Sequence, residues 1–249
     1  MDDKKRQNSM KILDDLISQL DMDAPVQDIR QGVFHTAVVT RECGLAATLP
    51  KDALRQEPPL VKEPGNLLSK SAQELAQLAY SPSILEGAVG MAAVNSLLEV
   101  DVDACVELNA AELIVEKGEG KAVAIVGHFP FIPRVREIAS QLWVIEKNPR
   151  GDDLGEEAAE QVIPQADVVA ITGTALTNHT LDRLLELSRP TAYVILLGDT
   201  APLCPLLFDY GVDALSGTRV VDPVLVLRCV SEGANFRQIR GTRRLTLIK

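Results

Sequence analysis

The spacing of apolar residues changes about halfway along the chain. In the first 120 residues, apolar positions three and four residues apart predict helices, and short alternating stretches predict strands. Proline and glycine predict a long loop over 50–70. The expected strands cover residues 28–31, 33–40 and 45–49. The expected helices cover residues 9–22, 71–80, 83–99 and 109–118. An antiparallel meander followed by helices is typical of an α+β domain.

Capping signals mark the starts of three of these helices. Ser71-Ala-Gln-Glu74 and Ser83-Ile-Leu-Glu86 match the capping box, in which side chain and backbone satisfy each other's donors. Asn109-Ala-Ala-Glu112 resembles a third capping box. The helix after Ser83 is rich in glycine and alanine, so its small face can pack very closely on a neighbour or a ligand.

From Lys121 onward, short apolar runs alternate with helical stretches. The expected strands cover 123–126, 142–145, 168–171, 193–197 and 214–215. Helices are expected around 132–138, 155–163, 178–188 and 222–232, with a short one after Pro202. Short apolar runs between helices are typical of buried parallel strands. We therefore predict an α/β domain over 120–249 with a Rossmann-like, doubly wound parallel sheet. A smaller α+β domain over 1–119 precedes it.

The final residues, 236–249, are expected to add an edge strand to this sheet. They carry four arginines: Arg237, Arg240, Arg243 and Arg244. A solvated edge is favoured over a nucleic-acid patch, because the chain has 25 basic and 35 acidic residues and a net charge of −10. Such a surface repels phosphate backbones and anionic membranes. Only 4% of residues are aromatic, which predicts an aliphatic core and disfavours base stacking.

The compartment is inferred from what the sequence lacks. The charged start shows no apolar signal segment, and no stretch approaches the length of a membrane-spanning helix. The four cysteines lie far apart and predict reduced, packed thiols: Cys43, Cys105, Cys204 and Cys229. We expect a cytoplasmic protein with a small-molecule ligand, no nucleic-acid or membrane partner, and a homodimer as an open alternative.

The binding site is expected at the carboxyl ends of the parallel strands, where ligands bind in open α/β sheets. Four of the five strand ends carry glycine, which lets the backbone approach a ligand, and hydroxyls and helix N-termini there supply donors. The alternative is that these residues only form tight turns and helix caps. The expected ligand-binding residues at this edge are Gly127, His128, Phe129, Pro130, Gly173, Thr174, Asn178, Gly198, Thr200 and Gly217.

A dinucleotide site is disfavoured. Glu146 follows Gly127 by 19 residues, where a ribose-binding acid would lie, but the first turn reads Gly-His-Phe-Pro-Phe. Its phenylalanines fill the space that a pyrophosphate needs. Walker A and G-x-S-x-G motifs are both absent from the sequence. A nucleoside- or methyl-donor-like ligand that uses Glu146 stays open.

A metal site is a further alternative. His128 and His179 both lie near strand ends, with Glu146 and Asp199 as candidate oxygen ligands, although no HxxxH or HExxH spacing supports them. Cys204, soon after Asp199, would be a reactive thiolate if it began a helix, whereas the alternative is a packed thiol. A divalent transition metal is therefore the candidate cofactor, and its identity is unknown.

The motifs together resemble a known family. Gly90-Met-Ala-Ala-Val-Asn95, Val126-Gly-His-Phe-Pro-Phe131, Thr172-Gly-Thr-Ala-Leu-Thr-Asn178, Leu197-Gly-Asp-Thr-Ala-Pro202 and Leu215-Ser-Gly-Thr218 occur in the expected order. They are similar to the family described as "putative heavy-metal chelation". The resemblance covers nearly the whole chain. It implies an enolase-N-terminal-like domain before a Rossmann-like domain, with a cleft between them. The implied role is heavy-metal chelation, or condensation or hydrolysis of pterin-, flavin- or siderophore-like molecules.

The resemblance also implies site residues. The matching positions are Gly127, Phe129, Pro130, Glu146, Gly173, Thr174, Asn178, Gly198 and Pro202. The chain departs from the family pattern at His128 and Asp199, and both changes add a polar group that can bind metal. From the first domain we expect Glu86 and Asn95 to contribute, the alternatives being a capping carboxylate and a buried helix amide.

Three functional hypotheses follow. In the first, the protein is an enzyme, with Glu146 or Asp199 as general acid/base and glycine–threonine turns holding anionic groups. In the second, it sequesters a metal or metal complex without catalysis, through His128, His179, Asp199 and Cys204. In the third, it is an interaction protein whose polar edge is only turn chemistry. The sequence leaves the question of catalysis open.

Overall fold

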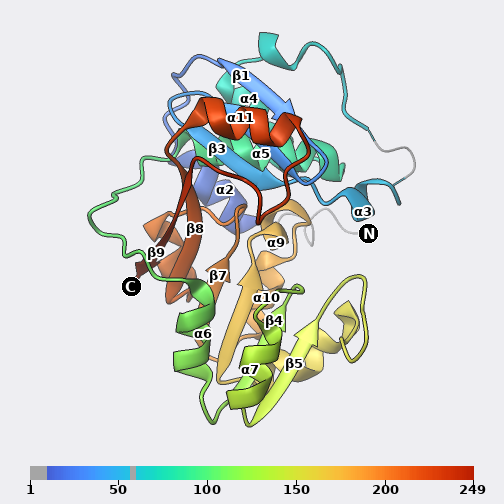
Figure 1. Cartoon of the computed structure of the whole chain (residues 1–249), viewed down its shortest axis with the longest axis vertical. Helices are drawn as coiled ribbons and strands as arrows, with labels where there is room; N and C mark the ends of the chain where they lie inside the picture. Colours follow the sequence, from blue (N-terminus) through green and yellow to red (C-terminus); the bar gives the residue numbers. More distant parts are fainter. Residues whose placement is uncertain (1–9, 57–59) are drawn as a thin grey trace.

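The chain folds around two sheets. The structure is a computed structural model that describes residues 10–56 and 60–249 (Figure 1). Residue 9 of the first expected helix, Pro58 and Pro59 lie outside these ranges. Strands β1, β2 and β3 form a small sheet, and β4 to β9 form a six-stranded one. None of the helices within the described ranges is long and apolar enough to cross a membrane.

The first sheet is the expected antiparallel meander. Its strands are β1 (Asp28–Gln31), β2 (His35–Val39) and β3 (Cys43–Ala47). The helices and 3₁₀ turns of this half are α2 (Lys11–Ser18), α3 (Pro50–Ala53), η1 (Leu67–Ser69), α4 (Ala72–Gln77), η2 (Leu78–Tyr80) and α5 (Ile84–Leu97). Helix α5 packs on β2 and β3. The contact is very close, because a Cβ on Gly44 of β3 would lie 2.1 Å from the Ala92 carbonyl oxygen of α5.

Two local expectations in this half are wrong. The region 50–70 is not all loop, because Pro50 starts α3 after Leu49 adopts a left-handed φ of 52°. At the start of α5, Ser83 makes no cap, and Glu86 instead accepts hydrogen bonds from the Ser81 hydroxyl and, at 2.7 Å, from the Lys62 N–H. The capping box at Ser71 is confirmed in both directions.

The second sheet has the predicted Rossmann-like arrangement. Its strands follow the order β5-β4-β6-β7-β8-β9, parallel except for β9. They are β4 (Ala122–Val126), β5 (Gln141–Ile145), β6 (Val168–Thr172), β7 (Tyr193–Leu197), β8 (Ala214–Val220) and β9 (Thr242–Ile248). Strand β5 lies on one side of β4 and β6 lies on the other. The switch point of the sheet is therefore between β4 and β6.

Helices cover both faces of this sheet, as a doubly wound fold requires. They are α6 (Ala110–Gly118), α7 (Ile132–Ile138), η3 (Glu156–Ala158), α8 (Ala159–Val162), η4 (Ile163–Gln165), α9 (Thr174–Thr177), α10 (Leu181–Leu187), η5 (Pro205–Tyr210) and α11 (Pro223–Ser231). Val123 and Ile125 pack with α6 and α7, whereas Ala124 belongs to the core on the side of α8 and α10. Alternation along buried strands therefore supplies two apolar faces.

The strand after residue 214 is longer than its apolar run predicts. We expected Ser216, Gly217 and Thr218 to form a turn, but β8 continues to Val220 and pairs with β9 over its whole length. The sequence argument misses this because β9, the confirmed edge strand, comes from the tail. Gly217 is thus a strand residue opposite Leu245.

Two helices cover strands that are distant from them in the sequence. Helix α6 covers β6 and β7, so a division after residue 119 separates it from the strands that it covers. Helix α11, capped by Asp222 as expected, lies across β1 and β2 of the first sheet (Figure 1). The chain therefore returns to its first half before forming β9. The largest fully buried side chains are all Ile, Leu or Met, which confirms the aliphatic core.

We expect Gly90→Ala to destabilise the protein by about 2 kcal/mol or more, despite the better helix propensity of alanine. The new Cβ would lie 1.9 Å from the backbone nitrogen of Ala79, which cannot rotate away. Urea unfolding measures the change. Gly155→Ala is the control, because the atoms nearest to its new Cβ belong to the movable Glu157 carboxylate. Equal stability of the two variants would contradict this packing.

Candidate functional site

The loop of residues 198–203 closes the middle of the carboxyl edge of the large sheet. Thr200 is buried, and its hydroxyl accepts a hydrogen bond from the Ala47 N–H at 2.9 Å. Its carbonyl accepts one from the Asn95 side chain at 3.3 Å. A Cβ on Gly173 would lie 2.4 Å from the Ala201 nitrogen, so glycine is needed for this close approach. Thr200 and Asn95 thus join the two halves of the chain, and Gly173 lets the loop backbone pack against the end of β6.

A buried ion pair strengthens the same contact. His35 of β2 and Asp199 are 4% and 6% exposed, and their Nε2 and Oδ2 atoms lie 2.8 Å apart. The other Asp199 oxygen accepts from the Thr218 hydroxyl at 2.6 Å. His35 Nδ1 faces the Ala234 carbonyl at 3.3 Å. Both ring nitrogens of His35 therefore face oxygen atoms, and both oxygens of Asp199 have partners.

The electrostatics of Asp199 follow from these partners. Burial raises the pKa of the Asp199 carboxyl. This effect is outweighed by three groups that lower the pKa, namely His35, the Thr218 hydroxyl and the more distant Arg244. The net pKa lies below the ordinary value of 3.8. A carboxylate that stays ionised and has both oxygens occupied is poorly suited to proton transfer. Among the two expected acid/base residues, Glu146 has the more open surroundings.

A cavity of about 350 Å³ lies at the switch point, which we call the switch-point cavity. It is formed by the ends of β4, β5 and β6, by α8 and α10, and by Leu49 and Asp52 of the first half. The structure brings together six of the expected site residues here: Gly127, His128, Phe129, Glu146, Thr174 and Asn178. Gly127 has a φ of 105°, a left-handed value that favours glycine at this turn.

The polar groups of the switch-point cavity come from both halves of the chain. Asp52 accepts a hydrogen bond from Asn148 at 3.1 Å, which joins α3 to the segment after β5. One oxygen of the half-buried Glu146 accepts from the Asn148 N–H at 3.3 Å. On the facing wall, Arg183 Nε donates to Glu160 at 2.9 Å. The switch-point cavity is therefore lined by acidic, basic and amide groups together with apolar side chains.

The remaining expected residues lie elsewhere. Pro130, Gly198, Asp199 and Gly217 line a second cavity on the other side of Phe129. Glu86 is buried at the start of α5 with the partners described above. The Asn95 amide donates to Leu45 and Thr200, and its Oδ1 is a buried oxygen without a partner among the described residues. Neither Glu86 nor Asn95 lines the switch-point cavity.

The structure does not join His128 and His179 in one cluster. His128 is 41% exposed and pairs with Asp153 at 2.8 Å, while His179 contacts the Ala79 carbonyl at 2.8 Å. Within residues 10–56 and 60–249, no three His, Cys, Asp or Glu side chains are grouped to hold a metal ion. Cys204 does precede a helix, the 3₁₀ helix η5, but burial raises the pKa of this 4% exposed thiol, which favours the packed-thiol alternative.

Sequence reasoning missed four residues at these sites. His35 precedes an apolar stretch and carried no recognisable motif, although it is one of only three histidines. Asp52 and Arg183 lie in the cavity because α3 and α10 turn toward it, which local patterns do not encode. The short Pro50 helix start was the available signal for Asp52. The fourth residue, Arg244, comes close to Asp199 from the tail.

We expect Asp199→Asn to lower the free energy of unfolding by about 3 kcal/mol, because it removes one partner of a buried ion pair. Since the folded-state pKa of Asp199 is depressed, its stabilisation is present above pH 3.8 and lost as the pH falls below that value. Chemical unfolding between pH 3 and 6 measures this. The difference in the free energy of unfolding between Asp199→Asn and the unaltered protein should become smaller toward pH 3. Exposed Asp103→Asn is the control, and an equal effect of both variants would contradict the pair's importance.

Comparison with known proteins places this geometry in a family. Two family models match the chain, over residues 109–249 and 13–98, and both are described as "Putative heavy-metal chelation". An uncharacterised protein of Methanocaldococcus jannaschii is 30% identical over 184 residues, covering 68% of this chain and 70% of the relative.

Two crystal structures of proteins of unknown function resemble this one. The first, from Desulfitobacterium hafniense, has a TM-score of 0.84 and 26% identity over 98% of this chain and 100% of that one. The second, from Pyrococcus horikoshii, has a TM-score of 0.82 and 22% identity over 97% and 100%, and shows the fold alone. The chain belongs to the family described as "Putative heavy-metal chelation".

Proposed function

We propose that the protein binds a small polar organic molecule in the switch-point cavity and acts on it there. One observation carries the proposal: Glu146 and Asp52, from the two halves of the chain, face the same cavity of about 350 Å³. Sites for small molecules are typically concave, mostly apolar and supplied with a few polar groups. The switch-point cavity has such a mixed apolar and polar lining. It also lies at the switch point of the sheet, where doubly wound folds bind ligands.

The ligand that suits these groups has both hydrogen-bond donors and acceptors. Carboxylates of Asp52 and Glu146 accept from amines, amides or hydroxyls, while Lys147, Asn178 and the threonine hydroxyls donate to carbonyl or acidic oxygens. Phe129 offers an apolar surface beside them. Pterin-, flavin- and siderophore-like molecules combine polar edges with flat or apolar parts, so this class fits the lining.

Glu146 is our candidate for general acid/base in a condensation or hydrolysis of such a molecule. Its carboxylate is half-buried and lines the cavity. Among the described residues, one of its oxygens is engaged, in the long contact with the Asn148 N–H. A positioned carboxylate that can reach a bound substrate typically contributes about 10²–10⁴-fold to a reaction. Asp199 is assigned no proton-transfer role, because both of its oxygens are held.

The side chains of residues 10–56 and 60–249 do not fit a resident heavy-metal centre. Soft metals prefer thiolates and imidazoles. Burial raises the pKa of Cys43 to about 12 and also raises the pKa of Cys105, so both thiols resist ionisation. His128 and His179 have separate partners. We therefore propose that the bound organic molecule, rather than the protein's side chains, chelates the metal.

A second candidate is a nucleoside or methyl-donor ligand in the same cavity. The observation that favours it is that Glu146 directly follows β5, the strand beside β4, and faces the cavity. An acidic residue at that point binds ribose hydroxyls in related folds. S-adenosylhomocysteine and adenosine are suitable probes, and binding of either in place of the first class would select this candidate.

We expect Glu146→Gln and Asp52→Asn each to weaken ligand binding about tenfold, the usual worth of a hydrogen bond to a charged group. Native mass spectrometry of the purified protein identifies molecules that it retains. Titration with riboflavin, neopterin and 2,3-dihydroxybenzoate, followed by fluorescence or calorimetry, then measures affinity.

Exposed Glu157→Gln is the matched control, since Glu157 belongs to η3 but does not line the cavity. Its affinity should equal that of the unaltered protein. The proposal fails if no molecule is retained or bound, or if the cavity variants bind as tightly as the control. Elemental analysis after metal addition tests the metal assignment separately, because metal uptake without an organic molecule would contradict it.

A further inference from the structure

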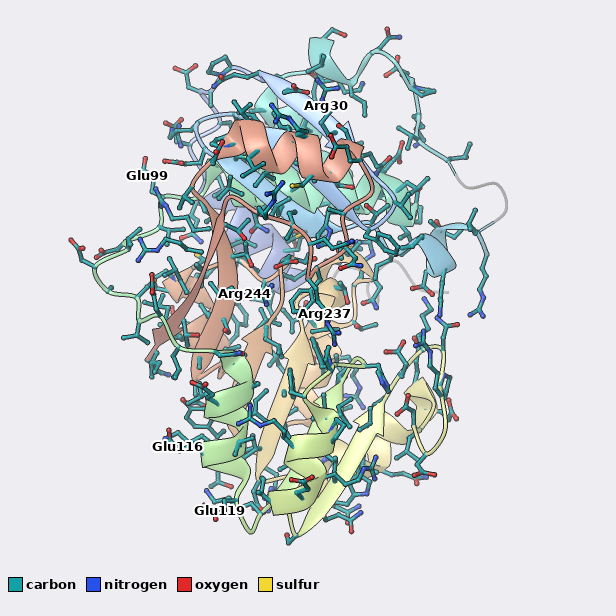
Figure 2. The ribbon with its side chains drawn as sticks, viewed as in Figure 1. Arg30, Glu99, Glu116, Glu119, Arg237 and Arg244 are labelled. Carbon is teal, nitrogen blue, oxygen red and sulfur yellow. The ribbon has the colours of Figure 1, made fainter. Side chains whose placement is uncertain are left out.

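A second cavity lies on the opposite side of the Phe129 turn from the switch-point cavity. It has a volume of about 320 Å³. It is formed by the end of β7, the middle of β8, the starts of α6 and α7, the segment before β9, and Arg244 of β9 itself. We call it the arginine cavity, because Arg134, Arg237 and Arg244 line it. Figure 2 shows Arg237 and Arg244 close together on one face, between α11 and the upper ends of α6 and α7.

The charge of the arginine cavity is opposite to that of the chain. Three arginines line it against one carboxylate, Asp199, which is already paired with His35. No ion pair between described residues contains Arg134, Arg237 or Arg244, whereas neighbouring Arg243 pairs with Glu107. In a chain with net charge −10, a cavity lined by three arginines outside these pairs is a local attraction for anions.

Aromatic rings form the walls. Three of the five phenylalanines line the cavity, namely Phe129, Phe131 and Phe236. Phe129 and Phe131 stack with centroids 5.1 Å apart, and the Arg244 guanidinium lies 4.1 Å from the centre of the Phe236 ring. Phe236 is 40% exposed, so part of its ring is accessible to a ligand. A flat ring would cover these apolar faces and stack on them.

We propose that the arginine cavity is a second binding site, which takes an anionic small molecule that carries a flat ring. Arg237 and Arg244 would hold its carboxylate or phosphate, and the phenylalanines would contact its ring. Guanidinium groups suit both anions because they donate two parallel hydrogen bonds. This site does not depend on the function proposed for the switch-point cavity. The shared Phe129 turn places the two ligands side by side, as a two-substrate or effector arrangement requires.

The size of the cavity selects a small molecule over a polymer. A volume of about 320 Å³ holds a ring system with one acidic group. A nucleic acid would have to approach an acidic surface over a much larger area, which the net charge disfavours. The arginines and the phenylalanines line the same cavity, so the ligand that fits it best carries both an anionic group and a flat ring.

The test is calorimetric titration with 1-naphthyl phosphate and 1-naphthoate, which distinguish the two acids, alongside neutral 1-naphthalenemethanol and inorganic phosphate. We expect at least one naphthyl anion to bind, and the neutral alcohol and phosphate to bind at least about tenfold more weakly. Arg237→Ala/Arg244→Ala should weaken the bound anion at least about tenfold. Phe236→Leu should weaken the naphthyl anion and leave inorganic phosphate unchanged.

Arg243→Ala is the matched control, because it removes one tail arginine that pairs with Glu107 and does not line the cavity. It should bind the naphthyl anion as the unaltered protein does. Circular dichroism and thermal unfolding confirm that each variant is folded. The proposal is overturned if neither anion binds, if the neutral alcohol binds equally well, or if the double variant matches the Arg243 control.

Discussion

The contact between the 198–203 loop and the first sheet is the constraint on which the rest of the structure depends. Thr200 joins the two halves with bonds from its hydroxyl and its carbonyl, and Gly173 admits the loop backbone where a Cβ would collide. The His35–Asp199 pair adds a charge interaction shielded from water. Because these bonds join the sheets, apolar residues of both halves share one core.

This contact also decides where ligands can bind. The carboxyl edge of a doubly wound sheet is normally an open crevice, but here its centre is filled by the loop and by β2 and β3. The switch-point cavity and the arginine cavity lie on the two sides of the Phe129 turn. The first turn carries phenylalanine in place of a phosphate-binding glycine run, so Phe129 separates two cavities instead of opening one long groove.

Periodicity predicted most of the fold because local burial determines it. The strands of the large sheet are buried on both faces and therefore appear as short apolar runs. The site was harder to predict, because its residues meet through tertiary packing. Thr200 looked like a ligand-binding hydroxyl in a turn but bonds Ala47 across the sheets. The tail arginines looked like a solvated edge, and Arg243 and Arg244 are both exposed. The sequence could not show that Arg244 also borders a cavity, because that depends on which segments pack beside β9.

The same buried pair has a consequence for the charge of the arginine cavity. Asp199 borders that cavity, and an unpaired carboxylate there would oppose an anionic ligand. The His35 ring and the Thr218 hydroxyl each contact one of its oxygens, so the carboxylate is held by these partners rather than left to oppose a ligand in the cavity. The residue that joins the two sheets is therefore also the one that keeps the cavity attractive to anions. Stability and ligand preference are coupled here, because one ion pair serves both.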